Sequence, residues 1–426
     1  MRHRVDLAPV SPDIFRSIIG DEAMEVLRTL GRRLQGLRVV HVNATPYGGG
    51  VSELLRSAVP LLNGLGLRVE WQVISGDTRF FEVTKGFHNA LQGARFTLSP
   101  EAEEIYLLNN AANARRFDGE YDVVVVHDPQ PAALRAFAAA SKRIWIWRCH
   151  IDTAHPDPEV AAFLTPFLEQ YDALVFTMDD FVLPSLRGRP IRVIAPGIDP
   201  LSPKNFGLPQ DVCERIVLWH GIDPRRPLMT QVSRFDPWKD PLGVVRVYRA
   251  ARVRVPGLQL ALLGSMAHDD PEGWRLYERL RSEVGEDPDV LIGTNLTGIS
   301  NVEVNAFQRS SSVVIQKSLR EGFGLVVSET LWKGTPLVAG RTGGIRLQVP
   351  PEANACLVDP DDEHAFVDRV VWLLEHPEEA KRLALLGREH VKRHFLITRM
   401  VQDELNLIAD LVEAQANSAT GTSPEM

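Results

Sequence analysis

Two glutamates, Glu321 and Glu329, are separated by seven residues around a glycine-bearing loop and the apolar segment that follows it. Gly322 and Gly324 precede this segment, which we expect to be a helix. The free N–H groups and positive dipole end of a helix start suit a phosphate group. Ionised carboxylates accept strong hydrogen bonds from paired sugar hydroxyls. The combination predicts a site for a diphosphate flanked by two sugars, as in a nucleotide-sugar. Two ordinary surface glutamates are the alternative.

Two cations follow the expected strand Leu228–Val232, namely Arg234 and Lys239. The ends of parallel strands are where α/β folds bind ligands. A guanidinium grips phosphate oxygens in a fork, and a lysine adds a point charge. The cations therefore favour a phosphate site, although Asp236 and Asp240 leave ordinary surface ion pairs as the alternative.

The glycine run that ends in Gly49 and Gly50 follows the first expected strand, Leu37–Val42. Consecutive glycines let a ligand approach the backbone closely and leave N–H donors unobstructed. The spacing is not G-x-G-x-x-G, so the dinucleotide fingerprint does not apply. Its place between a strand and a helix favours a ligand loop over a plain turn.

Three histidines have positions or spacings that could carry chemistry. His150 closes an expected strand, where a single histidine more often has a structural role. His390 and His394 have the i,i+4 spacing of metal ligands, but Glu389 precedes both, so the metalloprotease pattern is absent. They predict a solvated helix face and no metal site.

Short, apolar strands alternate with helical segments along the chain, which predicts parallel sheets covered on both faces. The alternation restarts after residues 196–200, which carry two prolines and a glycine. The fold class is therefore α/β with two Rossmann-like domains, residues 1–198 and 199–394. We expect a C-terminal helix over 395–415 that returns to the first domain, and a frayed tail over 416–426. The other expected strands are Val69–Ile74, Val123–Val126, Ile144–Trp147, Ala173–Phe176, Ile191–Ile194, Leu258–Leu263, Val290–Ile292, Val313–Gln316 and Leu337–Ala339, and the expected helices include 11–35, Glu363–Leu374, Glu378–His394 and Arg399–Gln415.

The composition is that of an ordinary soluble globular protein, with 44% hydrophobic and 24% charged residues in 426. A net charge of −8 argues against general nucleic-acid binding, which needs basic surface. The three cysteines form no CxxC pair and fit a reducing compartment. No apolar run approaches the roughly 20 residues that span a bilayer. We expect a cytoplasmic protein without nucleic-acid or membrane partners.

The E-x₇-E spacing resembles that of retaining glycosyltransferases with the GT-B fold, in which two Rossmann-like domains face a central cleft. Longer strings narrow the resemblance to the family of trehalose glycosyltransferring synthases, and it covers nearly the whole chain except the tail. The strings are residues 43–53, 80–93, 148–152, 233–241 and 264–274.

This resemblance implies transfer of glucose from ADP- or UDP-glucose to free glucose, giving α,α-trehalose with retention and without a metal or further cofactor. It implies that Glu321 faces the donor hexose, Glu329 the ribose, and His150 a sugar. Arg234 and Lys239 would clamp the diphosphate. The remaining donor-side residues would be Gly49, Gly50, Asn295, Leu296, Gly322, Phe323, Gly324 and Leu325, and the acceptor would meet Lys85, His88, Asn89 and Asp128.

Four alternatives stay open at this point. A trehalose phosphorylase would use phosphate in place of the nucleotide, and another retaining glucosyltransferase would share the donor site. A hydrolase would need its two carboxylates on opposite sides of one bond. A sugar-binding protein without catalysis is the fourth, because fold does not fix function. A homodimer is also left open.

Overall fold

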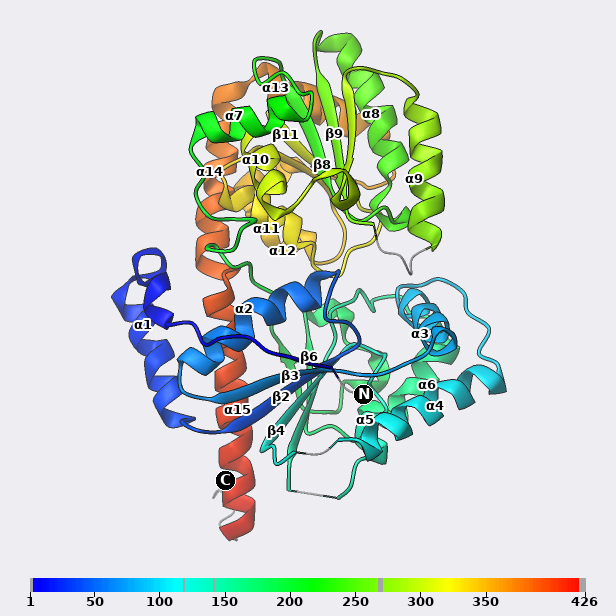
Figure 1. Ribbon diagram of the computed structural model, residues 1–426, viewed down its shortest axis with the longest axis vertical. Helices are drawn as coiled ribbons and strands as arrows, with labels where there is room; N and C mark the ends of the chain where they lie inside the picture. Colours follow the sequence, from blue (N-terminus) through cyan, green and yellow to red (C-terminus); the bar gives the residue numbers. More distant parts are fainter. Residues whose placement is uncertain (1–2, 118, 141, 267–270, 421–426) are drawn as a thin grey trace. The chain divides into compact units, whose positions relative to one another are not determined.

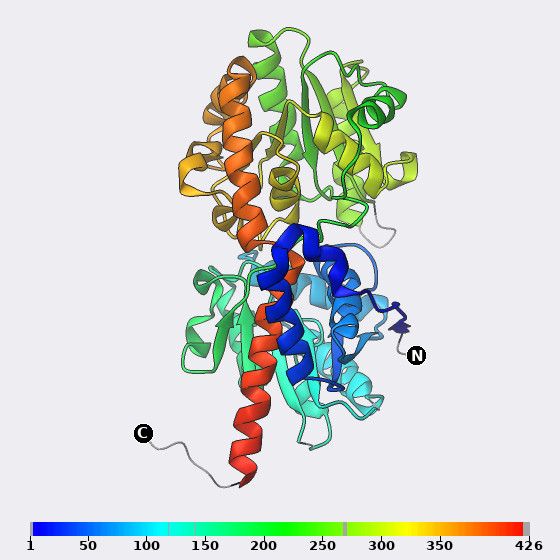
Figure 2. The ribbon, with the colours of Figure 1, turned by 90° about the vertical axis from the view of Figure 1, so that its left-hand side faces the viewer.

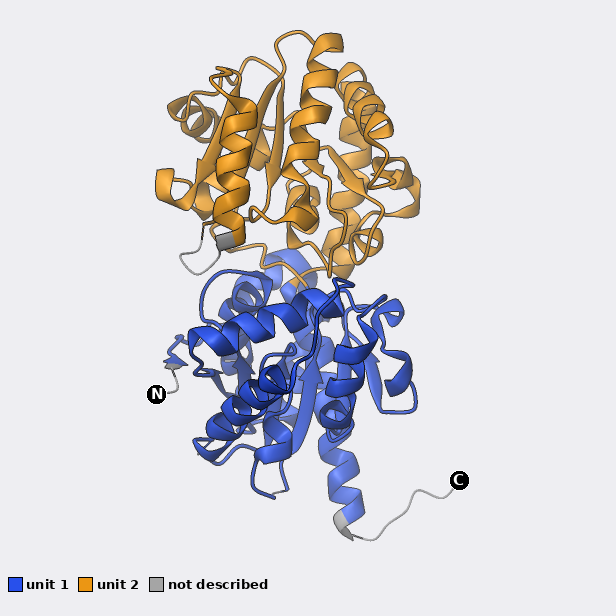
Figure 3. Cartoon of the chain, turned by 90° about the vertical axis from the view of Figure 1, so that its right-hand side faces the viewer, with its two compact units in different colours: residues 1–196, 397–426 blue, residues 197–396 orange. Residues whose placement is uncertain are grey.

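A computed structural model describes residues 3–117, 119–140, 142–266 and 271–420. The chain divides into two compact units, residues 1–196 with 397–426, and residues 197–396 (Figure 3). The sequence placed the boundaries at 198/199 and 394/395. Residues 264–274, one of the sequence strings that carry the family resemblance, lie partly outside the described residues, at 267–270.

Unit 1 contains a seven-stranded sheet in the order β1-β3-β2-β4-β5-β6-β7. All neighbours are parallel except β1, which pairs antiparallel with β3 at the edge. The sequence missed β1, because its three residues carry no apolar run. The central strands are buried along their whole length, which is why they read as continuous apolar runs. The strands are β1 His3–Val5, β2 Arg38–Asn43, β3 Arg68–Val73, β4 Val123–His127, β5 Ile144–Arg148, β6 Ala173–Phe176 and β7 Ile191–Val193.

The helices of unit 1 include α1 and the C-terminal α15, which lie side by side (Figures 1 and 2). Arg33 near the end of α1 pairs with Glu413 of α15. The single helix expected over 11–35 is divided, since a 3₁₀ turn, η1, precedes α1 and Gly20 adopts a φ of 84°. The elements are η1 Pro12–Phe15, α1 Arg16–Arg33, α2 Gly50–Gly64, α3 Thr78–Leu91, α4 Pro100–Arg115, α5 Leu134–Phe137, α6 Pro158–Leu168, η2 Asp179–Phe181, η3 Pro184–Leu186 and α15 Ile397–Thr420.

The expected frayed tail is wrong for residues 416–420, which continue α15, and residues 421–426 lie outside the described part. Extending an existing helix adds a hydrogen bond for each residue fixed, so polar residues can follow a packed helix at little cost.

None of the described helices is long and apolar enough to cross a membrane. The three cysteines are free and buried.

Unit 2 contains a six-stranded sheet in the order β10-β9-β8-β11-β12-β13, with every pair parallel. The sequence missed β13, which has only two residues. The strands are β8 Leu228–Val232, β9 Gln259–Gly264, β10 Val290–Thr294, β11 Val313–Gln316, β12 Leu337–Gly340 and β13 Leu357–Val358. The helical elements are α7 Gln210–Trp219, η4 Pro237–Lys239, α8 Pro241–Arg254, α9 Pro271–Val284, η5 Asn295–Thr297, α10 Asn301–Ser310, α11 Leu325–Trp332, α12 Ile345–Gln348, η6 Pro351–Cys356, α13 Glu363–Glu375 and α14 Pro377–His394.

Each sheet has a point where the strand order reverses. In unit 1 the chain runs from β2 to β3 on one side, and then returns to place β4 on the other side of β2. In unit 2 the same reversal separates β8 from β11. Ligands of doubly wound sheets bind beyond the carboxyl ends of the strands at such a reversal. The loops after β2, β4, β8 and β11 are therefore where a site is expected.

Candidate active site

The loop after β8 carries both predicted cations. Arg234 is half-exposed and pairs with Asp236 at 3.2 Å, so the surface ion pair considered as an alternative does form. The Asp236 carboxylate also accepts a hydrogen bond from the Trp238 N–H at 2.9 Å and caps η4. Buried Gln231 donates to the carbonyl of Lys239 at 2.7 Å and holds the end of the turn against the strand.

The loop after β11 is joined to the loop after β8. Lys239 Nζ lies 2.5 Å from Glu321 Oε2, and both side chains are largely buried. The Leu319 N–H donates to the carbonyl of Trp238 at 2.8 Å, which links the two backbones. The structure thus brings Lys239 and Glu321 into contact across the strand-order reversal of unit 2.

Gly324 directly precedes α11, and its backbone conformation explains why a glycine stands in this loop. Its φ of 80° and ψ of 68° lie in the left-handed region, and a Cβ there would meet Glu321 Cγ at 2.9 Å. Gly344 allows a second close approach, since its Cβ would lie 2.5 Å from the carbonyl oxygen of Gly322. Among the described residues no side chain caps the start of α11. Its first N–H groups, at Leu325 and Val326, therefore suit an anion.

Glu329 lies inside α11 and is only 1% exposed. Its Oε1 lies 3.6 Å from Nζ of Lys204. Its Oε2 is buried without a hydrogen-bond partner in the part of the chain that the structure describes. A buried carboxylate oxygen without a donor is costly, so this atom points to a ligand hydroxyl. Sequence reasoning did not find Lys204.

Two further predicted donor residues lie at the carboxyl end of β10. The Asn295 side chain accepts from the Met266 N–H at 2.7 Å and donates to the Met266 carbonyl at 3.2 Å. Its visible role is to tie two loops together. Leu296 is 56% exposed and therefore accessible. Phe323, in the loop after β11, is buried and packs against Phe395 at a ring-centroid distance of 5.5 Å, so its side chain anchors that loop.

The glycine loop of unit 1 follows β2. Gly49 adopts a φ of 102° and precedes α2, which begins at Gly50. A Cβ on Gly49 would meet no atom within 4 Å, so its conformation and not crowding requires glycine. Buried Asn43 holds the loop by donating to the carbonyl of Thr45 at 2.7 Å. The loop lies between a strand and a helix, as the sequence predicted, and the sheet topology places it at the strand-order reversal of unit 1.

His150 follows β5 and belongs to a row of three histidines. His150 Nε2 lies 2.9 Å from His127 Nδ1, and His127 Nε2 lies 3.0 Å from His41 Nδ1. We refer to His41, His127 and His150 as the imidazole chain. His41 Nε2 lies 3.3 Å from Oε1 of Glu404, which projects from α15. Burial, helped by the nearby Arg148, holds the pKa of each imidazole below its usual range.

Asp128 follows β4 and is fixed in an unusual backbone conformation, with a φ of 64°. Its carboxylate accepts a hydrogen bond from the backbone N–H of His150 at 2.8 Å, and its backbone carbonyl accepts one from the indole N–H of Trp147 at 2.9 Å. Burial raises the pKa of Asp128 to about 7, against the His150 N–H and Arg148, which both lower it. Asp128 therefore has a pKa near neutrality, and it lies beside His150.

The other three predicted acceptor residues lie on α3. Lys85 is exposed, whereas His88 and Asn89 are partly buried. The aromatic side chains of α3 differ in burial, since Phe87 is fully buried whereas Phe81 is 37% exposed. Phe81 follows the buried Phe80, and successive helical residues lie about 100° apart, so only one of the two faces the core.

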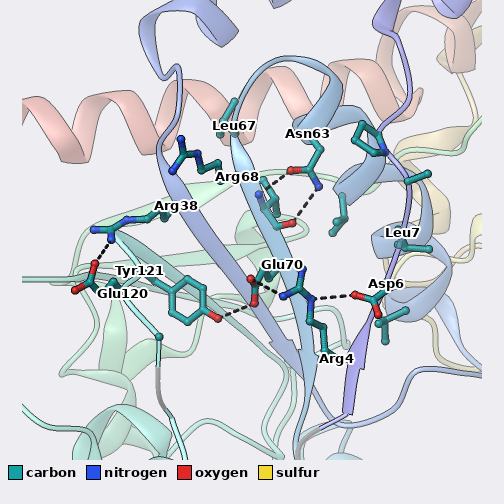
Figure 4. A pocket seen from close by; sticks show the side chains of 16 residues that line it. Arg4, Asp6, Leu7, Arg38, Asn63, Leu67, Arg68, Glu70, Glu120 and Tyr121 are labelled. Carbon is teal, nitrogen blue, oxygen red and sulfur yellow. Dashed lines mark hydrogen bonds and ion pairs between the residues drawn. The ribbon is translucent and has the colours of Figure 1, made fainter.

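A hollow of about 670 Å³ lies elsewhere in unit 1, beside the amino ends of β2 and β3 (Figure 4). Several of its charged side chains pair with one another. Glu70 pairs with Arg4 at 3.0 Å and accepts a hydrogen bond from the Tyr121 hydroxyl at 2.7 Å, and Arg38 pairs with Glu120 at 2.7 Å. The hollow lies at the opposite end of the strands from the predicted ligand loops.

Among the remaining predicted residues, His390 donates a hydrogen bond from Nε2 to the carbonyl of Leu347 at 2.9 Å, since a carbonyl only accepts. It is partly buried, whereas Glu389 and His394 are exposed. Within the described residues no group of three or more acidic, histidine or cysteine side chains could hold a metal ion.

Comparisons with known proteins identify the class. Residues 219–390 match the model of the family described as glycosyl transferases group 1, and residues 41–183 match the model described as trehalose synthase, N-terminal domain. A crystal structure of α,α-trehalose 6-phosphate synthase from Burkholderia multivorans superposes with a TM-score of 0.68 at 18% identity, covering 90% of this chain and all of that one. The protein is thus a glycosyltransferase with the GT-B fold.

Relatives of higher sequence identity define one family within this class of glycosyltransferases. A trehalose synthase from Rubrobacter xylanophilus is 48% identical over 403 residues, which cover 93% of this chain and 96% of the relative. The chain belongs to the trehalose synthase family. A trehalose phosphorylase from Pleurotus pulmonarius is a more distant relative, 28% identical over 84% of this chain and 55% of its own length.

Proposed function

We propose that the protein transfers glucose from ADP- or UDP-glucose to free glucose and forms α,α-trehalose with retention of configuration. The observation that carries this proposal is the arrangement around α11. The Lys239–Glu321 pair lies beside a helix start without a side-chain cap among the described residues, and the helix holds Glu329 with a buried, unpartnered oxygen. Cations, N–H groups and a carboxylate are the groups that a diphosphate and a ribose require.

In the proposed reaction, the bond between the glucose anomeric carbon and the diphosphate oxygen breaks, and the anomeric hydroxyl of the acceptor bonds to that carbon on the same face. The leaving diphosphate takes the proton of the acceptor hydroxyl. Arg234, Lys239 and the first N–H groups of α11 stabilise the charge that builds on the diphosphate. Such stabilisation is usually the largest single contribution to catalysis. We propose no metal or further cofactor in this step, because these groups supply the positive charge.

Unit 1 supplies the acceptor residues in this proposal. The candidates are Lys85, His88 and Asn89 on α3, and Asp128 beside His150. Hydroxyls of glucose need directional donors and acceptors, and this set contains both. A trehalose phosphorylase is the second candidate, since Arg234 and Lys239 could bind phosphate. The unpartnered Glu329 oxygen favours the nucleotide, because a phosphorylase has no ribose to place there.

Product analysis tests the proposal. The protein is incubated with ADP-, UDP- or GDP-glucose and either glucose or glucose 6-phosphate, and the product linkage is assigned by NMR. We expect a 1,1-linked α,α product from glucose and release of the nucleoside diphosphate. A parallel incubation of trehalose with phosphate checks for glucose 1-phosphate. Formation of glucose 1-phosphate without turnover of any nucleotide-glucose would replace the proposal with the phosphorylase.

A further inference from the structure

The imidazole chain connects a residue of the proposed sugar site to the C-terminal helix. The ring centroids of His41 and His127 lie 5.3 Å apart, and those of His127 and His150 lie 5.2 Å apart. Their facing nitrogens lie 2.9–3.0 Å apart, within hydrogen-bond distance. His41 and His127 are buried, whereas His150 is partly exposed at the end of β5.

The carboxylate of Glu404 lies at the buried end of the imidazole chain, beside His41. Glu404 Oε1 lies 3.3 Å from His41 Nε2, and Glu404 Oε2 accepts a hydrogen bond from Arg148 at 3.0 Å. The side chains of Glu404 and Arg148 are 5% and 4% exposed. Within the described residues neither Glu404 Oε1 nor His41 Nε2 has a hydrogen bond, so this 3.3 Å contact pairs two otherwise unsatisfied buried atoms. When the contact closes to a hydrogen bond, the carboxylate oxygen accepts and His41 presents N–H at Nε2.

Burial and the guanidinium of Arg148 lower the pKa values of the three rings, which favours the neutral form of each. A neutral imidazole has one donor nitrogen and one acceptor nitrogen. If His41 donates from Nε2 to Glu404, its Nδ1 is an acceptor, and His127 must donate from Nε2. His127 Nδ1 is then an acceptor, and His150 must donate from Nε2. The order of donors is thereby determined along the whole chain.

We propose that Glu404 is a positioning residue that sets the tautomer of His150, so that His150 Nδ1 accepts a hydrogen bond from a sugar hydroxyl. The sugar part of this inference rests on the proposed function. An acceptor nitrogen favours a hydroxyl and disfavours a carbonyl or phosphate oxygen, which cannot donate. By setting the tautomer of His150, the imidazole chain would make this residue selective for a ligand that carries a hydroxyl group.

Nitrogen-15 NMR of the histidine-labelled wild-type protein tests the order of donors without any activity. The signals are assigned with His41→Gln, His127→Gln and His150→Gln variants. We expect all three residues to carry hydrogen on Nε2 and a lone pair on Nδ1. Hydrogen on Nδ1 of His41 or His127 would overturn the proposal. This measurement on the unmodified protein remains decisive if a variant fails to fold.

Glu404→Gln tests the control by the carboxylate. The new amide can accept from Arg148 with its oxygen and donate to His41 with its nitrogen, which reverses every donor in the chain. We expect hydrogen on Nδ1 of all three histidines, and kcat/KM for transfer to fall about tenfold, the value of one good hydrogen bond. Asp410→Asn is the matched control, because it removes a carboxylate from the exposed side of the same helix, where Asp410 pairs with Arg192.

Breaking the middle of the chain separates a tautomer effect from a general effect on folding. In a His127→Ala background, Glu404→Gln should no longer change the tautomer of His150 or the remaining activity. Unchanged His150 tautomer in the single Glu404→Gln variant, or a reversed tautomer with unchanged kcat/KM, would refute the proposal. If the NMR pattern is as expected but no nucleotide-glucose is turned over, the proposed function fails while the tautomer assignment stands.

Discussion

Lys239 and Glu321 form an ion pair of 2.5 Å between the loop after β8 and the loop after β11. The pair spans the strand-order reversal of unit 2, where doubly wound sheets bind ligands. Each partner offsets the charge of the other in the absence of ligand. An anionic diphosphate could share Lys239 and leave Glu321 to accept from a sugar hydroxyl, which is the exchange that the proposed reaction requires.

Removing either cation of the loop after β8 should reduce transfer. We expect Arg234→Ala and Lys239→Ala each to lower kcat/KM by on the order of 10²-fold, because a preorganised charge stabiliser is lost. Steady-state kinetics with saturating glucose measures this. Arg225→Ala is the control, since Arg225 is exposed and pairs with Asp223 before the same strand begins. Near-normal turnover in both site variants would remove these residues from the donor site.

The two glutamates should differ in which kinetic constant they affect. Glu329→Ala should weaken binding of the nucleoside diphosphate, because its buried oxygen then no longer meets the ribose. Glu321→Ala should mainly lower kcat, because a contact to the transferred hexose strengthens in the transition state. Calorimetry with the nucleotide and turnover assays separate the two effects. Equal loss of nucleotide affinity in both variants would contradict this division of roles.

The polar side chains of α3 should act on the acceptor alone. We expect Lys85→Ala or Asn89→Ala to raise the KM for glucose and leave the KM for nucleotide-glucose nearly unchanged. Arg79→Ala, on the same helix, removes an exposed cation that pairs with Glu101 and should change neither value. A higher donor KM with intact glucose kinetics would place α3 outside the acceptor site.

Gly324 should tolerate no side chain. Alanine there would cost about 1–2 kcal/mol for its left-handed backbone and would also displace Glu321, whose Cγ lies 2.9 Å from the added Cβ. Gly334→Ala is a matched control, because Gly334 has a similar φ of 70° but an added Cβ would lie 3.9 Å from its nearest neighbour, the Leu385 side chain. Urea unfolding should show comparable losses of stability, whereas only Gly324→Ala should also abolish most activity. Full activity of Gly324→Ala would show that the position of Glu321 is not critical.

The imidazole chain should make the protein less stable in mild acid. The folded pKa of each of the three histidines lies below the ordinary value of 6.5, so the unfolded chain binds more protons once the pH falls below 6.5. Their contribution is complete above pH 6.5 and is lost as the pH falls towards the folded values. Thermal unfolding from pH 7.5 to pH 5 should show this loss, and it should be smaller in His127→Gln. An identical pH dependence in that variant would argue against burial of a neutral His127.

Much of the fold could be predicted because its signals are local. The strands β6, β8 and β11 have the predicted bounds, since a buried parallel strand is a continuous apolar run between turn residues. The strands β1 and β13 were missed because two or three residues are too few to carry a pattern. Gly324 also indicated a loop from local sequence alone, because a left-handed backbone conformation favours glycine whatever its tertiary contacts are.

The sequence by itself therefore determined the α/β alternation, the two halves and the candidate residues that follow strands. Only the tertiary structure decided which of these residues meet. Glu404 lies 256 positions from Arg148, yet the two pair at 3.0 Å. A charged residue among the buried Val401, Leu405 and Ile408 was the one signal of its role. Such pairings depend on how the sheet and α15 pack, and residues that are distant in sequence leave no periodicity by which a partner can be recognised.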